Sequence, residues 1–218
     1  MKGKYFYILF GFLCLMIFSA MLIKSSIKGE AVCFGDSITH GAKVNGHSWV
    51  YFLSKEHKDV NFINEGRNGR KTSDKNEILP VLKKYPSSNY FLIFLGVNDL
   101  KNGNDSLVNQ CVENMKWMLE QIREKNKKTK IVILAPTDIN LKTMSQLNVK
   151  KKYNENTKSS LFKLEMEYKR LAKKNSLGFI SLLKTVSPPD YVDGLHPNEK
   201  GQQQIAAAVW KGLIRLFN

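Results

Sequence analysis

Short apolar runs and longer amphipathic stretches alternate along most of the chain. The apolar runs are four to six residues long and predict five strands, at residues 31–34, 60–63, 90–95, 130–134 and 177–181. The longer stretches space their apolar side chains as helices do, and predict helices at residues 48–57, 73–84, 106–126, 153–175 and 198–217. Strands that alternate with helices are typical of a parallel sheet covered by helices on both faces. The pattern predicts one α/β domain over residues 29–218.

A different pattern marks the first thirty residues. Residues 5–23 carry no charge and lie between lysines on both sides. In a helix such a stretch is about 28 Å long, enough to cross the hydrocarbon core of a bilayer. It is longer than a usual signal-peptide core and lacks a clear small-x-small cleavage site. Residues 1–28 are therefore predicted to form an N-terminal hydrophobic helix that anchors the chain in a membrane, with a cleaved signal segment as the alternative.

The location of the domain follows from this segment. Lysines at the amino terminus favour keeping that end inside, which places the rest of the chain outside. We therefore expect a membrane-anchored domain on the extracytoplasmic side, or a secreted one if the segment is cleaved.

Composition and charge exclude several classes of protein. Apolar residues make up 43% of the chain, too many for a disordered protein. Three cysteines cannot build a disulfide framework, and with four histidines and no close cysteine pair a zinc site is not expected. The formal charge of +15 is concentrated in lysine clusters at residues 125–130, 150–152 and 169–174. We interpret these clusters as solvated helix ends, with attraction to an anionic membrane or wall polymer as the alternative. No motif for nucleic-acid binding accompanies them, so no such partner is expected.

Three polar clusters stand where a parallel sheet would place a binding site. Residues 35–41 (GDSITHG) follow the first predicted strand and residues 96–99 (GVND) follow the third. Residues 193–198 (DGLHPN) precede the last helix. Ligands of such sheets bind at the carboxyl ends of the strands, so we expect the three clusters to meet at one edge.

The residue types in these clusters suit acyl transfer. A serine hydroxyl such as Ser37 is a weak nucleophile until a base takes its proton. His196 is the candidate base, and Asp193 is placed to hold the imidazole in the required tautomer. The Asn98 amide and backbone N–H groups of Ser37 and a glycine would stabilise an oxyanion. Each cluster alone also fits an ordinary turn or helix cap, but the combination favours chemistry.

These segments resemble a known family. Residues 34–41, 96–99 and 193–196 resemble blocks I, III and V of the SGNH (GDSL) hydrolases, and residues 63–72 (INEGRNGRKT) resemble block II of their arylesterase and acetylesterase branch. The resemblance covers residues 31–217. It implies a flavodoxin-like three-layer α/β/α fold with five parallel strands, and it implies neither a metal nor a cofactor.

The resemblance also implies roles for single residues. Ser37 would be the nucleophile, His196 the base and Asp193 its partner. Gly69 would complete an oxyanion hole with Asn98 and the Ser37 N–H group, and Gly66 is the alternative glycine.

The implied activity is that of a serine esterase for short acyl esters, with acetyl esters on glycans favoured. A lysophospholipase or thioesterase, a glycan-binding module without turnover, and a cationic scaffold on anionic polymers are the alternatives. Asp36 and His40 lie beside the nucleophile and are candidate substrate contacts. Ile139 and Met144, in the long loop at residues 136–150, would line an acyl pocket or lid, or merely cover the sheet edge. The sequence does not indicate an oligomeric state.

Overall fold

Five parallel strands form the central sheet, in the order β2-β1-β3-β4-β5. The computed structural model describes residues 27–218, and all of these strands lie within that range. They are β1 (Gly29–Gly35), β2 (Val60–Gly66), β3 (Tyr90–Phe94), β4 (Lys130–Ala135) and β5 (Gly178–Ser181). This order is that of a flavodoxin-like doubly wound sheet, so the predicted fold class is confirmed for the described residues.

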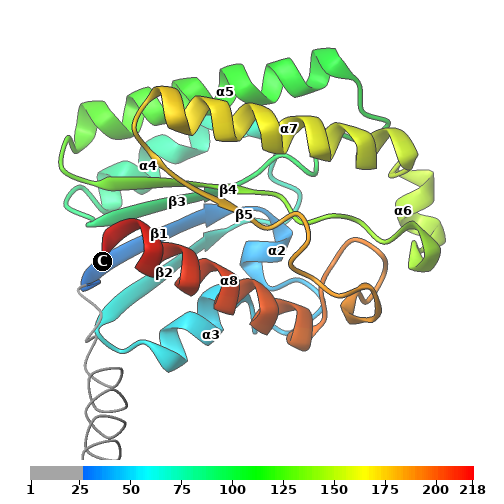
Figure 1. Cartoon of the computed structure of the whole chain (residues 1–218), viewed down its shortest axis with the longest axis horizontal. Coiled ribbons are helices and arrows are strands. Elements are labelled where there is room, and N and C mark those ends of the chain that lie inside the picture. The colour runs from blue at the N-terminus through cyan, green and yellow to red at the C-terminus, as the bar shows by residue number, and fades with distance from the viewer. Residues whose placement is uncertain (1–26) are drawn as a thin grey trace, which may run out of the picture.

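Helices cover both faces of the sheet (Figure 1). Helices α4 (Ile78–Lys84), α5 (Asp105–Lys125) and α7 (Glu155–Lys174) cover one face, and α3 (Trp49–Glu56) and α8 (Glu199–Phe217) cover the other. Alternate side chains of β1 supply the two cores, since Val32 and Phe34 face the α5 side while Ala31 and Cys33 face the α8 side. Because helices cover both faces of β1, the residues on both faces are apolar and the strand is a continuous apolar run.

Two predicted segments differ in detail from the structure. The predicted helix at 73–84 is a 3-10 helix, η1 (Thr72–Glu77), followed by α4. Pro80 has no N–H group to donate, and it is tolerated here because it lies in the first turn of α4. The predicted loop at 136–150 contains the 3-10 helix η2 (Leu141–Thr143) and the short helix α6 (Gln146–Lys150). Single turns of helix are too short to show a hydrophobic period.

Three strands end level with one another at the carboxyl edge of the sheet. Gly35, at the end of β1, pairs with Gly66 of β2 and with Phe94 of β3. The chain order reverses between β1 and β3, and this switch point is where ligands bind in doubly wound sheets. The loops after β1, β2 and β3 therefore begin side by side. Two further short elements, α2 (Ser37–His40) and the 3-10 helix η3 (Pro188–Asp190), lie on loops at this edge.

The predicted membrane helix, with its uncharged residues 5–23, lies outside the described residues. Between residues 27 and 218, no helix combines the length and the apolar character needed to cross a membrane.

Candidate active site

Ser37 stands at the carboxyl end of β1, where the chain turns sharply into α2. The Asp36 carboxylate caps this short helix by accepting the Ile38 N–H at 2.9 Å. The helix ends after one turn, because Gly41 adopts a left-handed conformation with φ of 89°. The turn holds Ser37 as the first residue of α2, at the switch point of the sheet.

The loop before α8 brings an imidazole against this serine. His196 Nε2 lies 3.1 Å from Ser37 Oγ, although the residues are 159 positions apart. On the other side of the ring, His196 Nδ1 lies 3.0 Å from Asp193 Oδ2 and 3.1 Å from Oδ1. The structure thus aligns a hydroxyl, an imidazole and a carboxylate in the order that nucleophilic acyl transfer requires.

The Asp193 carboxylate also folds its own loop. Its Oδ1 accepts the backbone N–H groups of Leu195 at 3.2 Å and His196 at 2.8 Å. Burial disfavours the charged form, but the hydrogen bonds and the charge of His196 outweigh it, so the pKa of Asp193 lies well below its usual range. The Asp193 carboxylate is therefore ionised at neutral pH, where it can accept a hydrogen bond from the imidazole.

Asn98 is held rigidly on the loop after β3. Its Oδ1 accepts the Tyr153 hydroxyl at 2.8 Å, and its Nδ2 donates to the Arg70 carbonyl at 3.2 Å. Burial raises the pKa of Tyr153, so its hydroxyl remains a donor at neutral pH. These two bonds fix the orientation of the amide and leave one of the two Nδ2 hydrogens for a ligand.

The loop after β2 offers Gly69 rather than Gly66 as a free donor. The Gly66 N–H donates to Asn64 Oδ1 at 2.9 Å. Within residues 27–218, neither the Gly69 N–H nor the Ser37 N–H has a hydrogen-bond partner. Gly69 is exposed and has φ of 75°, a conformation that a glycine adopts without strain.

Sequence reasoning missed the residue that ties this loop to the sheet. Arg70 is buried and donates through Nη1 to the carbonyls of Gly35 at 2.6 Å and Glu65 at 2.5 Å. Its guanidinium also lies over the Phe34 ring, 4.0 Å from the centroid, and its Nε bonds Glu77 at 2.9 Å. An arginine within a turn of glycine and asparagine was the available signal.

The predicted substrate contacts have different positions. His40 is exposed beside the nucleophile, as a substrate contact requires. Asp36 is 1% exposed, because its carboxylate points into the protein to cap α2, and its role as a substrate contact stays a prediction. Ile139 is equally buried and belongs to the core beneath α7, and Met144 is half-buried against Gly194.

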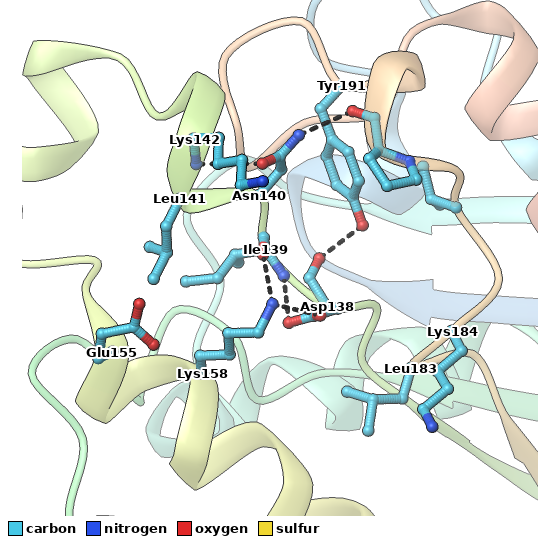
Figure 2. A pocket seen from close by; sticks show the side chains of 12 residues that line it. Asp138, Ile139, Asn140, Leu141, Lys142, Glu155, Lys158, Leu183, Lys184 and Tyr191 are labelled. Atoms are coloured by element: carbon cyan, nitrogen blue, oxygen red, sulfur yellow. Dashed lines mark hydrogen bonds and ion pairs between the residues drawn. The ribbon is translucent and has the colours of Figure 1, made fainter.

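A cavity of about 470 Å³ lies beside the triad of Ser37, His196 and Asp193, not over it. Figure 2 shows its wall, where Lys158 bonds Asp138 at 2.7 Å and the Tyr191 hydroxyl donates to the Asp138 carbonyl at 2.7 Å. Neither the serine nor the imidazole of the triad lines this cavity. Ile139 therefore helps to line a cavity that the triad residues do not line.

Asp36 carries an unusual buried carboxyl group. Its Oδ2 has no hydrogen-bond partner among the described residues. Burial raises its pKa to about 7, against the opposing effects of the Ile38 N–H and the charges of His196 and Arg70, while the Asp99 charge raises it further. The folded protein therefore binds this proton more tightly than the unfolded chain does. Between about pH 4 and pH 7, Asp36 ionises in the unfolded chain but stays protonated in the folded protein. The free energy of unfolding therefore falls as the pH rises through this range.

We expect Asp36→Asn to remove this loss, because the amide keeps the Oδ1 acceptor and cannot ionise. The change in the free energy of unfolding that the substitution causes should be more favourable at pH 8 than at pH 5, by up to about 3 kcal/mol. Urea unfolding at the two pH values measures the difference. Asp59→Asn, at an exposed carboxylate, is the control and should show no such gain. Identical pH dependence in Asp36→Asn and the unmodified protein would contradict the prediction.

One family model and several solved structures are similar to this chain. Residues 33–204 match the model of the GDSL-like Lipase/Acylhydrolase family. An aryl esterase from M. smegmatis has a similar structure, with a TM-score of 0.75 and 20% identity over 87% of this chain and 100% of that one. A carbohydrate acetylesterase family member from Sinorhizobium meliloti gives a TM-score of 0.73 and 18% identity over 88% and 99%. No curated protein matches the chain significantly. At these identities the solved structures show a shared fold.

Proposed function

Because the chain belongs to the GDSL-like lipase/acylhydrolase family, a family of carboxylic ester hydrolases, we propose that it is a serine esterase for short acyl esters, acetyl esters foremost. The observation that carries the proposal is the 3.1 Å approach of His196 Nε2 to Ser37 Oγ, with Asp193 on the other ring nitrogen. This geometry supplies a nucleophile, a base and an orienting carboxylate in one line.

The reaction has two halves. Ser37 Oγ attacks the ester carbonyl while His196 Nε2 takes the hydroxyl proton, and Asp193 stabilises the imidazolium that forms. The N–H groups of Ser37 and Gly69 and the Asn98 amide are the donors for the oxyanion. Collapse of the intermediate expels the alcohol, which receives the proton from His196 and leaves an acyl group on Ser37. Water, deprotonated by His196, then attacks the acyl-enzyme and releases the acid and Ser37.

Two observations support a short acyl group. The 470 Å³ cavity is lined by neither Ser37 nor His196, so it does not extend the site with space for a long acyl chain. Solved structures with the same fold include a carbohydrate acetylesterase from Sinorhizobium meliloti and an acetyl xylan esterase. The exposed Gly69 and His40 leave the edge around Ser37 open to a bulky alcohol such as a glycan.

Hydrolysis of p-nitrophenyl esters from acetyl to dodecanoyl by the full-length protein tests this function. We expect kcat/KM to fall by at least tenfold from acetyl to octanoyl, and every turnover to depend on Ser37. Rates that rise with chain length would instead indicate a lysophospholipase or thioesterase. Binding of acetylated glycan without any Ser37-dependent hydrolysis would indicate a binding module.

We also propose that residues 1–28 deliver or anchor the domain outside the cytoplasm. The support is the uncharged stretch at 5–23 between flanking lysines. Outside the cytoplasm the domain would meet O-acetyl groups on envelope or environmental glycans, and we propose these groups as its substrates.

A further inference from the structure

We propose that Asn148 is a positioning residue, which holds the backbone of Asp193 so that its carboxylate meets the His196 ring. The inference rests on the proposed esterase function. Asn148 belongs to the short helix α6 and lies outside all the segments that carry the resemblance to esterases. It acts through Asp193, and it has no hydrogen bond to Ser37 or His196 within the described residues.

The contact is buried and specific. Asn148 is 2% exposed, and its Nδ2 donates to the Asp193 carbonyl at 3.1 Å. The Ser145 N–H donates to the same carbonyl, also at 3.1 Å. The Asn140 N–H donates to the next carbonyl, that of Gly194, at 2.8 Å. One segment, residues 138–148, therefore bonds two of the three loop carbonyls that precede His196, those of Asp193 and Gly194. We call this segment the clamp.

The clamp is itself anchored at both ends. At its start, Figure 2 shows the Tyr191 hydroxyl on the Asp138 carbonyl, and Asn140 Nδ2 donates to the Pro188 carbonyl at 2.8 Å. At its end, Ser145 Oγ accepts the Asn148 N–H at 3.3 Å and the Tyr153 N–H donates to the Asn148 carbonyl at 3.2 Å. The amide of Asn148 is thus offered to Asp193 from a fixed backbone.

The loop from Asp193 to His196 packs closely against the clamp at Gly194. Gly194 adopts φ of 77°, and a Cβ atom there would lie 2.6 Å from both the Asn140 carbonyl oxygen and the Met144 Cα. The fit between loop and clamp is therefore close. From this backbone position the Asp193 carboxylate reaches the His196 ring at 3.0 Å. A shift of about 1 Å in catalytic geometry can cost on the order of a hundredfold in rate.

The test is the effect of Asn148→Ala on turnover of p-nitrophenyl acetate by the full-length protein. We expect kcat to fall by 10- to 100-fold while KM changes by less than threefold, because the side chain does not touch substrate. Asn148→Asp serves as a second variant of the same shape, in which a carboxylate oxygen replaces the donor facing the Asp193 carbonyl. It should lower kcat at least as much. Urea unfolding identifies which variants are folded at the assay temperature.

A double-mutant cycle separates positioning from general destabilisation. In an Asp193→Asn background the orienting carboxylate is already lost, so Asn148→Ala should then change kcat by less than threefold. Asn104→Ala is the matched control. Asn104 caps α5 by accepting the Leu107 N–H at 3.0 Å, so its loss weakens the fold away from the triad and should leave kcat unchanged.

The results that would contradict the positioning role of Asn148 differ from the result that would contradict the esterase mechanism. An equal loss of kcat from Asn148→Ala in both backgrounds, or an equal loss from Asn104→Ala, would overturn the positioning role. So would full activity in a folded Asn148→Ala and a folded Asn148→Asp. Turnover that survives Ser37→Ala unchanged would instead overturn the proposed esterase mechanism itself, and this result does not depend on Asn148.

Discussion

Ser37→Ala is expected to lower kcat for p-nitrophenyl acetate by about four to six orders of magnitude. The substitution removes the only hydroxyl within hydrogen-bond distance of His196 Nε2 in the described part of the chain. Without it no acyl-enzyme forms, and only the oxyanion donors and the imidazole act on the ester. Alanine is well tolerated as the first residue of a helix, so the free energy of unfolding should change by about 1 kcal/mol or less.

Ser181→Ala provides the matched control. Ser181 also ends a strand of the sheet and is exposed, but its hydroxyl contacts Glu165 and, in the described part of the chain, no imidazole. Its replacement should leave kcat within twofold of the unmodified protein. Mass spectrometry after reaction with a fluorophosphonate should find one adduct, on Ser37, and none in the Ser37→Ala protein. Turnover that persists in the Ser37→Ala protein would eliminate this residue as the nucleophile.

His196→Ala should cause a loss of similar size, again about four to six orders of magnitude in kcat, because the serine then has no base. Asp193→Asn should leave more activity than either substitution, since the base remains and only its orientation and tautomer are disturbed. Both effects are measured on the same acetyl ester, at substrate concentrations that separate kcat from KM.

His47→Ala is the control for the histidine. His47 also contacts a carboxylate, with Nδ1 lying 2.6 Å from Glu199 Oε1, but no serine hydroxyl among residues 27–218 bonds its ring. It therefore reproduces the histidine–carboxylate contact without the nucleophile. Loss of activity in His47→Ala equal to that in His196→Ala would contradict the assignment of the base.

The strands and long helices could be predicted because their signals are local. On the predicted helix 106–126, the apolar side chains of Cys111, Met115 and Met118 recur at helical spacing, and the structure buries all three. The short helices α2 and α6 contain too few residues for such a recurrence. Their first residues are set by side-chain N-caps from Asp36 and Ser145 instead.

The candidate site could be predicted only as far as its motifs reach. The sequence named Ser37, Asp193 and His196, and the structure brings them into contact. Arg70 and Asn148 were missed, because what they do depends on carbonyl groups far away in the chain. The orientation of the Asp36 carboxylate could not be predicted for a related reason. A motif shows that a carboxylate stands beside the nucleophile, but only the turn of the chain determines whether it points to solvent or to the core.

The parallel direction of the strands has a consequence for reach. The chain enters the sheet at Gly29, at the amino end of β1, whereas the triad lies beyond its carboxyl end at Gly35. Seven residues of strand span about 20 Å. A membrane segment at residues 5–23, as the sequence predicts, would join the domain at the edge opposite to Ser37. Ser37 would then lie at least the length of this strand from the point where the membrane segment joins the domain, which favours polymers outside the bilayer over its lipids as substrates.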